Sequence, residues 1–218
     1  MSVVRIGHGG ASSLVRGNTL ESFDAALEIG VEMIEFDVRT QRGRLLLAHT
    51  KLHGALLRCP TLDRALDHLS QRRFSDVELN VDLKDAACVE PALAALDRFG
   101  VKGRTLLSSQ CPALLDRARE VDPSVATAIS VGGCVSRAVQ RWGGWRERVL
   151  EALASRRFDA LMAHHGLVDV PLVEATRERG ARIYAWTVQE QHLIRSLSDA
   201  GVSGIVTGDP RLFAAAGF

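Results

Sequence analysis

Short runs of apolar and β-branched residues alternate along the chain with longer segments in which apolar residues recur every three or four positions. The short runs predict strands, and the longer segments predict amphipathic helices. The predicted strands are residues 3–7, 31–38, 77–83, 105–108, 125–130, 160–163, 181–188 and 203–207. The predicted helices are residues 18–30, 62–74, 86–99, a segment that begins at Pro112, 145–156, 170–179, 189–200 and a short one near the end.

The first helix has recognisable end signals. Asn18 and Glu21 have the spacing of a capping box, and Gly30 is placed to end the helix in a left-handed conformation. After the second strand, a tight turn at residues 41–43 leads into an additional extended segment at 45–49. Only residues 50–60 separate that segment from the next predicted helix, so an open, shallow site is expected there.

Eight strand–helix units in one uninterrupted series predict an α/β fold, specifically a compact TIM (β/α)8 barrel without a large insertion domain. The strands are continuously apolar, as expected for parallel strands that are buried on both faces. Residues 1–218 are predicted to form a single domain. An open, doubly wound sheet is the alternative, although residues 7–10 lack the spacing of a dinucleotide-binding loop.

Charge and composition narrow the classes of partner. The chain has 27 Lys and Arg against 26 Asp and Glu, so it has no overall basic field that would attract nucleic acid. No apolar run approaches the ~20 residues that cross a bilayer, so no stable membrane insertion is expected. The four cysteines are widely spaced and no signal segment is evident, which favours a cytoplasmic location. The oligomeric state stays open.

In a barrel of this kind the chemistry lies where the strands end. Glu35 and Asp37 are two positions apart on one strand, so their side chains leave on the same side, and Asp82 ends the neighbouring strand. Carboxylates placed together are costly unless a proton or cation lies between them. The three oxygens suit Mg²⁺ or Ca²⁺, with Mn²⁺ also possible, better than Zn²⁺. A solvated strand end, or pairing with Arg5 or Arg39, is the alternative.

Other polar residues also lie at predicted strand ends. His8 and His49 flank the proposed metal site and are candidates for general base and general acid, although each alone has a structural interpretation. Lys84 points to the same side as Asp82 and is a candidate to offset charge on a phosphoryl group. Trp186 fits a substrate-pocket wall and a core position equally well, as do His164 and His165, and residues 142–145 fit a ligand-covering loop or surface packing.

The order and spacing of these residues resemble the glycerophosphodiester phosphodiesterase family. The pattern of that family runs H-R-G, P-E-N-T, an apolar helix, E-x-D, H-D, E-x-K, W-T-V and G-V-D-G-I-I-T-D-x-P. The matching segments of this chain are His8–Gly10, Asn18–Ala26, Gly30–Val38, Ala48–His49, Asp82–Lys84, Ala185–Val188 and Gly201–Pro210. The resemblance therefore covers nearly the whole chain.

The resemblance implies a TIM barrel that hydrolyses glycerophosphodiesters to glycerol 3-phosphate and an alcohol with a divalent metal. It implies acid/base roles for His8 and His49 and a phosphate contact for Lys84. It also implies a metal site formed by Glu35, Asp37 and Asp82. The expected partner is thus a small phosphodiester substrate.

Several positions depart from the family pattern. Gly9 replaces the family Arg, Arg16-Gly17 replaces P-E, Thr50 follows the second histidine, and Asp82 is shorter than the family Glu. We hypothesise that Arg16 takes over the role of the missing Arg. The alternatives are a weakly active or inactive barrel that binds a phosphorylated ligand, a phosphodiesterase acting on lysophospholipids, and a lyase with Lys84 as a Schiff-base residue.

Overall fold

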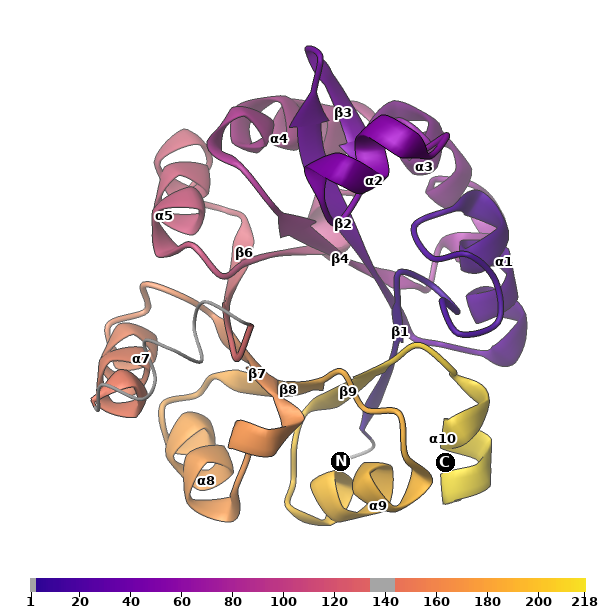
Figure 1. The fold of residues 1–218 in the computed structure, drawn as a ribbon. Helices are drawn as coiled ribbons and strands as arrows, with labels where there is room; N and C mark the ends of the chain where they lie inside the picture. The colour runs from indigo at the N-terminus through magenta and orange to yellow at the C-terminus, as the bar shows by residue number, and fades with distance from the viewer. Residues whose placement is uncertain (1–2, 134–143) are drawn as a thin grey trace.

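The computed structural model describes residues 3–133 and 144–218, and its parallel strands form a closed barrel (Figure 1). The barrel strands are β1 (Val4–His8), β2 (Met33–Gln41), β4 (Glu78–Leu83), β5 (Thr105–Ser109), β6 (Ala126–Val131), β7 (Ala160–His164), β8 (Arg182–Trp186) and β9 (Gly204–Thr207). β1 pairs in parallel with both β2 and β9, which closes the sheet. The predicted TIM barrel is confirmed, and the open-sheet alternative is wrong.

A ring of helices surrounds the barrel (Figure 1). It consists of α1 (Leu20–Ile29), α3 (Leu62–Leu69), α4 (Val89–Arg98), α5 (Pro112–Val121), α7 (Trp145–Ala154), α8 (Val170–Glu178), α9 (Gln191–Asp199) and α10 (Arg211–Ala216). Short 3₁₀ turns cover Arg72–Phe74, Ala86–Cys88, Lys102–Arg104 and His165–Leu167. Two predicted helices were therefore too long, because residues 72–74 and 86–88 form tighter turns next to α3 and α4.

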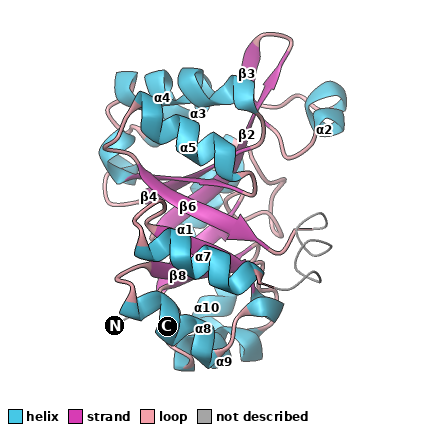
Figure 2. Ribbon diagram, turned by 90° about the vertical axis from the view of Figure 1, so that its left-hand side faces the viewer, coloured by secondary structure: helices cyan, strands magenta, loops and turns pink. Residues whose placement is uncertain are grey.

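The segment between the second and third barrel strands contains one element that the sequence did not predict. β3 (Arg44–Leu47) pairs antiparallel with the end of β2, as the extended segment at 45–49 indicated. It is followed by a short helix, α2 (Lys51–Leu56), whose N-cap Thr50 accepts a hydrogen bond from the backbone N–H of His53 at 3.1 Å. Figure 2 shows α2 at the end of the barrel toward which β6 points. The region expected to be open is thus walled by a helix.

The start of the first helix also differs from the prediction. Thr19, not Asn18, is the N-cap of α1, and its hydroxyl accepts a hydrogen bond from the backbone N–H of Ser22. Asn18 has a positive φ of 59° and its side chain turns away from the helix. The predicted end is confirmed, since Gly30 adopts the left-handed conformation that a residue with a Cβ disfavours.

The core lies in two layers because strand side chains alternate between the two faces of the sheet. One layer, which includes Ile34 and Phe36, packs between the sheet and the helices. The other layer fills the barrel with Ile6, Met33, Leu106, Ala128, Ala160, Met162, Tyr184 and Val206. Glu35 and Asp37 share the parity of Met33, so they continue the inward-facing row toward the end of the strand.

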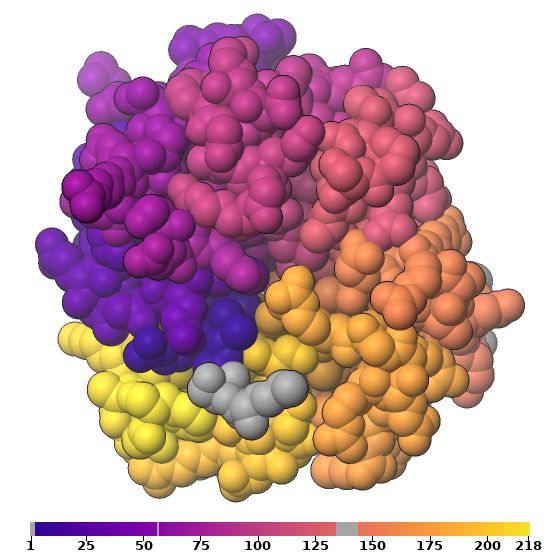
Figure 3. All heavy atoms as spheres, turned by 180° about the vertical axis from the view of Figure 1, so that it is seen from behind, coloured from indigo at the N-terminus to yellow at the C-terminus, as the bar shows by residue number. Residues whose placement is uncertain are grey.

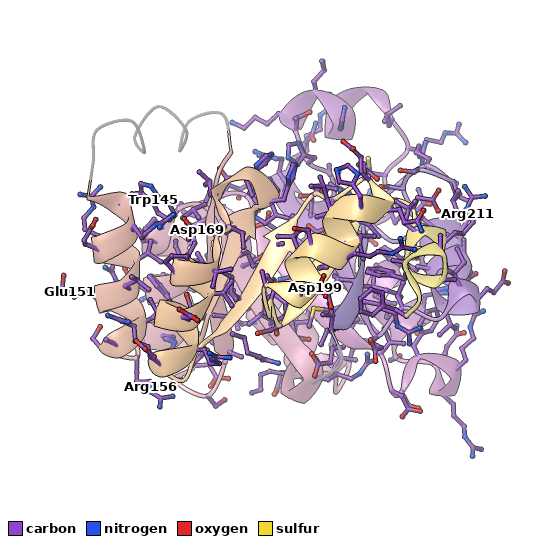
Figure 4. All side chains as sticks on the ribbon, turned by 90° about the horizontal axis from the view of Figure 1, so that it is seen from below. Trp145, Glu151, Arg156, Asp169, Asp199 and Arg211 are labelled. Atoms are coloured by element: carbon purple, nitrogen blue, oxygen red, sulfur yellow. The ribbon has the colours of Figure 1, made fainter. Side chains whose placement is uncertain are left out.

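The outer helices run in the opposite direction to the strands. Figure 4 shows Trp145 and Asp169 at one end of α7 and α8 and Arg156 at the other. The Arg146 guanidinium contacts the Asp169 carboxylate at 2.9 Å, which connects the starts of these two helices. Residues 142 and 143 of the proposed loop lie outside the described residues, and Gly144 is the N-cap of α7.

The far face of the barrel brings the two ends of the chain together. Figure 3 shows the first described residues (indigo) beside the last part of the chain (yellow), as the pairing of β1 with β9 requires. Across the part of the chain that the structure describes, no helix combines the length and the apolar character that a membrane crossing needs.

We expect the barrel interior to tolerate loss of the Tyr184 hydroxyl but not loss of its ring. Tyr184 is fully buried, and no described group hydrogen-bonds its hydroxyl. Tyr184→Phe should change the free energy of unfolding by less than about 1 kcal/mol, whereas Tyr184→Ala should lower it by about 3–5 kcal/mol through the cavity it leaves. Urea unfolding of both variants measures this, and equal losses would contradict the assignment of Tyr184 to the interior layer.

Candidate active site

The strand register brings three carboxylates together at the mouth of the barrel. His8 of β1 lies opposite Glu35 of β2, and Asp37 of β2 lies opposite Asp82 of β4. Glu35 and Asp37 are only 5% and 3% exposed. One oxygen from each of Glu35, Asp37 and Asp82 lies within 4.8 Å of the others. The predicted cluster therefore exists as a compact group of oxygens, in which Glu35 and Asp37 are buried and Asp82 is partly buried.

Lys84 provides most of the compensating charge for this cluster. Its Nζ lies 2.7 Å from Asp37 Oδ1 and 2.5 Å from Asp82 Oδ2. Burial acts to lower the pKa of Lys84, but the two carboxylates together outweigh it and raise the pKa above its usual range. Because the amine stays protonated, it is a poor nucleophile, which argues against the Schiff-base alternative.

The pKa values of the three carboxylates shift in different directions. Burial raises the pKa of Glu35 well above its usual range, and the charges of Asp37 and Asp82 raise it further. Burial likewise raises the pKa of Asp82. Burial also acts to raise the pKa of Asp37, but Lys84 and hydrogen bonds outweigh it and the pKa is lowered. Asp37 is thus the carboxylate that the protein itself stabilises in its charged form.

The loop after β1 supplies the remaining contacts to the carboxylates. The backbone N–H of Gly9 donates to Glu35 Oε2 at 3.0 Å. Asn18 Nδ2 donates to Asp37 Oδ2 at 2.8 Å, while Asn18 Oδ1 accepts from the backbone N–H of Asp37 at 3.0 Å. The sequence missed this role of Asn18. Its position beside the helix start indicated a cap, and only the folded loop shows its true partner.

The alternative partners considered for the carboxylates have other contacts. Arg5 lies 3.2 Å from Glu32, on the outer side of the barrel. Arg39 lies 3.8 Å from Asp85, and its Nη2 donates to the backbone carbonyl of His49 at 3.4 Å. Neither arginine neutralises the cluster. Arg39 instead restrains the backbone that carries His49.

The two histidines reach the same pocket from different elements. His8 ends β1, and its Nε2 lies 3.8 Å from Glu35 Oε2. Burial lowers the pKa of His8 because it disfavours the charged imidazolium, and the attraction of Asp37 only partly offsets this. His49 follows β3 and is more exposed. Both line a pocket of about 50 Å³ together with all three carboxylates and Lys84.

The rest of this pocket consists mainly of polar groups from later strands. Ser108, Gln110, Ser130 and Thr187 contribute hydrogen-bonding side chains that the sequence analysis had not assigned to substrate. Trp186 lines the pocket too, and its indole N–H is buried and hydrogen-bonds no described group. The sequence indicated Ser108 and Ser130 only through their positions on the inward-facing side of the strand ends. A serine at such a position does not by itself indicate a particular chemistry.

Two other predicted candidates lie outside this pocket as the structure describes it. His164 packs edge-on against Trp186 with 5.6 Å between ring centroids, and its Nδ1 accepts a hydrogen bond from the backbone N–H of Gly166. His165 stacks on His164 at 4.4 Å. His164 therefore packs against Trp186, and His165 packs against His164.

The donor set fits a hard divalent cation. All of the acidic ligand atoms are carboxylate oxygens, which Mg²⁺, Ca²⁺ and Mn²⁺ prefer. Asp82 Oδ1 is buried and has no hydrogen-bond partner among the described residues, although an orphaned buried oxygen is costly. A cation would satisfy this oxygen and relieve the repulsion that raises the pKa of Glu35.

Comparisons of this chain with known proteins agree on one family. The model of the "Glycerophosphoryl diester phosphodiesterase family" matches residues 8–67 and 48–212. The Mycobacterium tuberculosis protein named "Probable glycerophosphodiester phosphodiesterase 2" is 27% identical over 220 residues, which cover 87% of this chain and 81% of that protein.

Solved structures show the same fold. A crystal structure from Silicibacter pomeroyi DSS-3 has a TM-score of 0.86 and 24% identity, covering 100% of this chain and 95% of that one. An Oleispira antarctica phosphodiesterase in complex with the product sn-glycerol-3-phosphate has a TM-score of 0.79 and 21% identity, covering 97% and 95%.

We expect Lys84 to contribute far more to the free energy of unfolding than a less buried lysine that also contacts two aspartates. Lys102 also bridges two aspartates, Asp97 at 2.9 Å and Asp122 at 2.8 Å, but its side chain is 32% exposed against 13% for Lys84. Lys84→Met should lower the free energy of unfolding by about 3 kcal/mol, because it leaves buried charges unpaired. Lys102→Met should lower it by less than about 1 kcal/mol. Urea unfolding at pH 8 in EDTA measures both, and equal losses would contradict the compensating role of Lys84.

Proposed function

Since the chain belongs to the glycerophosphoryl diester phosphodiesterase family, we propose that it hydrolyses glycerophosphodiesters to glycerol 3-phosphate and an alcohol, using a divalent cation and two histidines. The observation that carries this proposal is the single pocket that holds Glu35, Asp37, Asp82, His8 and His49. The product bound to the Oleispira antarctica phosphodiesterase supports the same substrate class.

Glu35, Asp37 and Asp82 would hold the cation, with Mg²⁺ or Ca²⁺ preferred and Mn²⁺ also suitable. When bound, this ion supplies Lewis-acid polarisation of the phosphoryl group. Asn18, Gly9 and Lys84 keep the carboxylates in place through the contacts described above. Lys84 also offsets the negative charge that grows on the equatorial oxygens of phosphorus in the transition state.

The histidines move the protons of the reaction. One removes a proton from the nucleophile as the new oxygen–phosphorus bond forms. The nucleophile is water, or a neighbouring substrate hydroxyl that gives a cyclic phosphate which water then opens to glycerol 3-phosphate. The other histidine gives a proton to the departing oxygen as the ester bond breaks. His8 and His49 line one pocket from two different elements, β1 and the segment after β3, so a diester bound in that pocket is within reach of both.

The polar wall of the pocket suits the glycerol arm of the substrate. Ser108, Ser130 and Thr187 present hydroxyl groups that can hydrogen-bond a polyol, and Trp186 provides a flat apolar surface beside them. We further propose a single domain over residues 1–218 and a cytoplasmic location, in line with the sequence analysis. A barrel that binds a phosphorylated ligand without turnover is the second candidate, which the missing Arg at Gly9 favours.

The test is metal-dependent hydrolysis of glycerophosphoglycerol. Activity should be lost in EDTA and return with Mg²⁺, Ca²⁺ or Mn²⁺. His8→Gln and His49→Gln should each lower kcat by about 10²–10⁴-fold, because each removes an acid/base group. His192→Gln is the matched control, since His192 is exposed on α9, and it should leave kcat unchanged.

Two results would count against the proposal. Wild-type rates in both His8→Gln and His49→Gln would contradict the acid/base roles. Tight, metal-dependent binding of diesters without turnover by the wild-type protein would favour the second candidate.

A further inference from the structure

A second and larger cavity opens beside the active-site pocket. It has a volume of about 350 Å³ and shares His8, Asp37 and His49 with that pocket. Its outer walls come from the loop after β1 and from the segment that runs from β3 through α2. A phosphodiester centred on the two histidines therefore has one arm in each cavity.

The glycines that depart from the family pattern line this second cavity. Gly9 and Gly17 contribute backbone but no side chain to its wall. Gly9 has a left-handed φ of 56°, and a Cβ at Gly17 would lie 2.7 Å from Ser12 Cβ. Side chains at these positions would need the loop to move. The loop is therefore closely packed against itself at both glycines, and neither glycine sends a side chain into the cavity.

Arg16 is the arginine that lines this cavity, and its side chain reaches the cavity from an exposed position. Its backbone carbonyl accepts a hydrogen bond from the hydroxyl of Thr19, the N-cap of α1, at 2.7 Å. Its Nη2 donates to the backbone carbonyl of Arg58, beyond α2, at 2.9 Å. The guanidinium thus spans the two walls, and its remaining N–H groups can bind a ligand.

In the part of the cavity that lies away from the two histidines, the charge on the lining residues is positive. Among the described residues that line it, Asp37 is the one carboxylate, and Asp37 is already engaged by Lys84 and Asn18. Burial raises the pKa of the Cys59 thiol, while the charge of Arg16 acts in the opposite direction. The field of Arg16 therefore extends to the cavity wall where Cys59 lies.

The two cavities differ in what they can hold. The active-site pocket, at about 50 Å³, is much the smaller of the two, and its hydroxyl groups suit a polyol. The larger cavity adds apolar surface from Leu47 and Leu57 to the charge of Arg16. A bulkier alcohol belongs there, and a cationic alcohol such as choline would meet a like charge without a carboxylate to balance it.

We propose that the second cavity receives the leaving alcohol of the diester and that Arg16 selects alcohols that carry a negative charge, such as one bearing a second phosphate. This inference rests on the proposed hydrolysis of glycerophosphodiesters. It replaces the hypothesis that Arg16 takes over the role of the missing family Arg: Arg16 becomes a specificity-determining residue that contacts the far end of the substrate and not the scissile phosphorus.

The test compares three glycerophosphodiesters that differ in the charge of the alcohol. The substrates are glycerophosphoinositol 4-phosphate, glycerophosphoinositol and glycerophosphocholine. For the wild type, kcat/KM should fall in that order, with the first about tenfold or more above the last, mainly through KM. The preference should shrink in high salt, because salt screens exposed charges.

Arg16→Gln should lower the ratio of kcat/KM for the anionic substrate to that for the neutral one by about tenfold. Arg16→Lys should retain part of the preference, since it keeps the charge but not the planar donors. Arg72→Gln is the matched control, because Arg72 is an exposed arginine before β4 at the other end of the barrel. It should leave the ratio unchanged.

Equal kcat/KM values for the three substrates, or a wild-type preference for the choline diester, would overturn the inference. An Arg16→Gln variant that loses kcat/KM equally for all three would overturn it as well. A wild type that hydrolyses none of them contradicts the proposed function instead. Titration calorimetry with the same three compounds then decides the inference, since Arg16-dependent preference for the anionic one supports it and its absence overturns it.

Discussion

The organisation of this barrel mouth depends on the burial of three carboxylates within 4.8 Å of one another. Such a cluster is unfavourable by itself, because desolvation and mutual repulsion both act against the charged forms. The structure offsets this with Lys84, which contacts Asp37 and Asp82, and with the loop after β1, which donates to Glu35 and Asp37. The raised pKa of Glu35 shows that the compensation is incomplete.

The fold places these groups through strand register rather than through sequence proximity. The pairing of Asp37 with Asp82, and of His8 with Glu35, follows directly from the closure of the parallel sheet. The loop after β1 then serves two purposes at once. Asn18 orients Asp37, and Arg16, two residues earlier, extends across the neighbouring cavity to the backbone beyond α2. Under the proposed function, one short segment thus carries both a residue that orients a metal-site carboxylate and a residue that faces the leaving alcohol.

The sequence predicted the barrel and the carboxylate cluster because both depend on local, periodic features. Alternating apolar runs specify the strands, and the two-residue spacing of Glu35 and Asp37 specifies a shared face. Prediction from the sequence failed where tertiary contacts decide between two structures that are both possible locally. Asn18 and Thr19 can both cap a helix, and the partner that Asn18 finds on β2 determines which one does. The helix α2 is too short to show a period, and Gly54 lies in its middle.

The most direct test of this account is the position of a bound metal. Crystals grown with Mn²⁺ and measured at its absorption edge give an anomalous difference map that locates the ion. The account predicts one strong peak at the barrel mouth, about 2.0–2.6 Å from an oxygen of each of Glu35, Asp37 and Asp82. A peak elsewhere, or none at this cluster under conditions in which the protein is active, would contradict it.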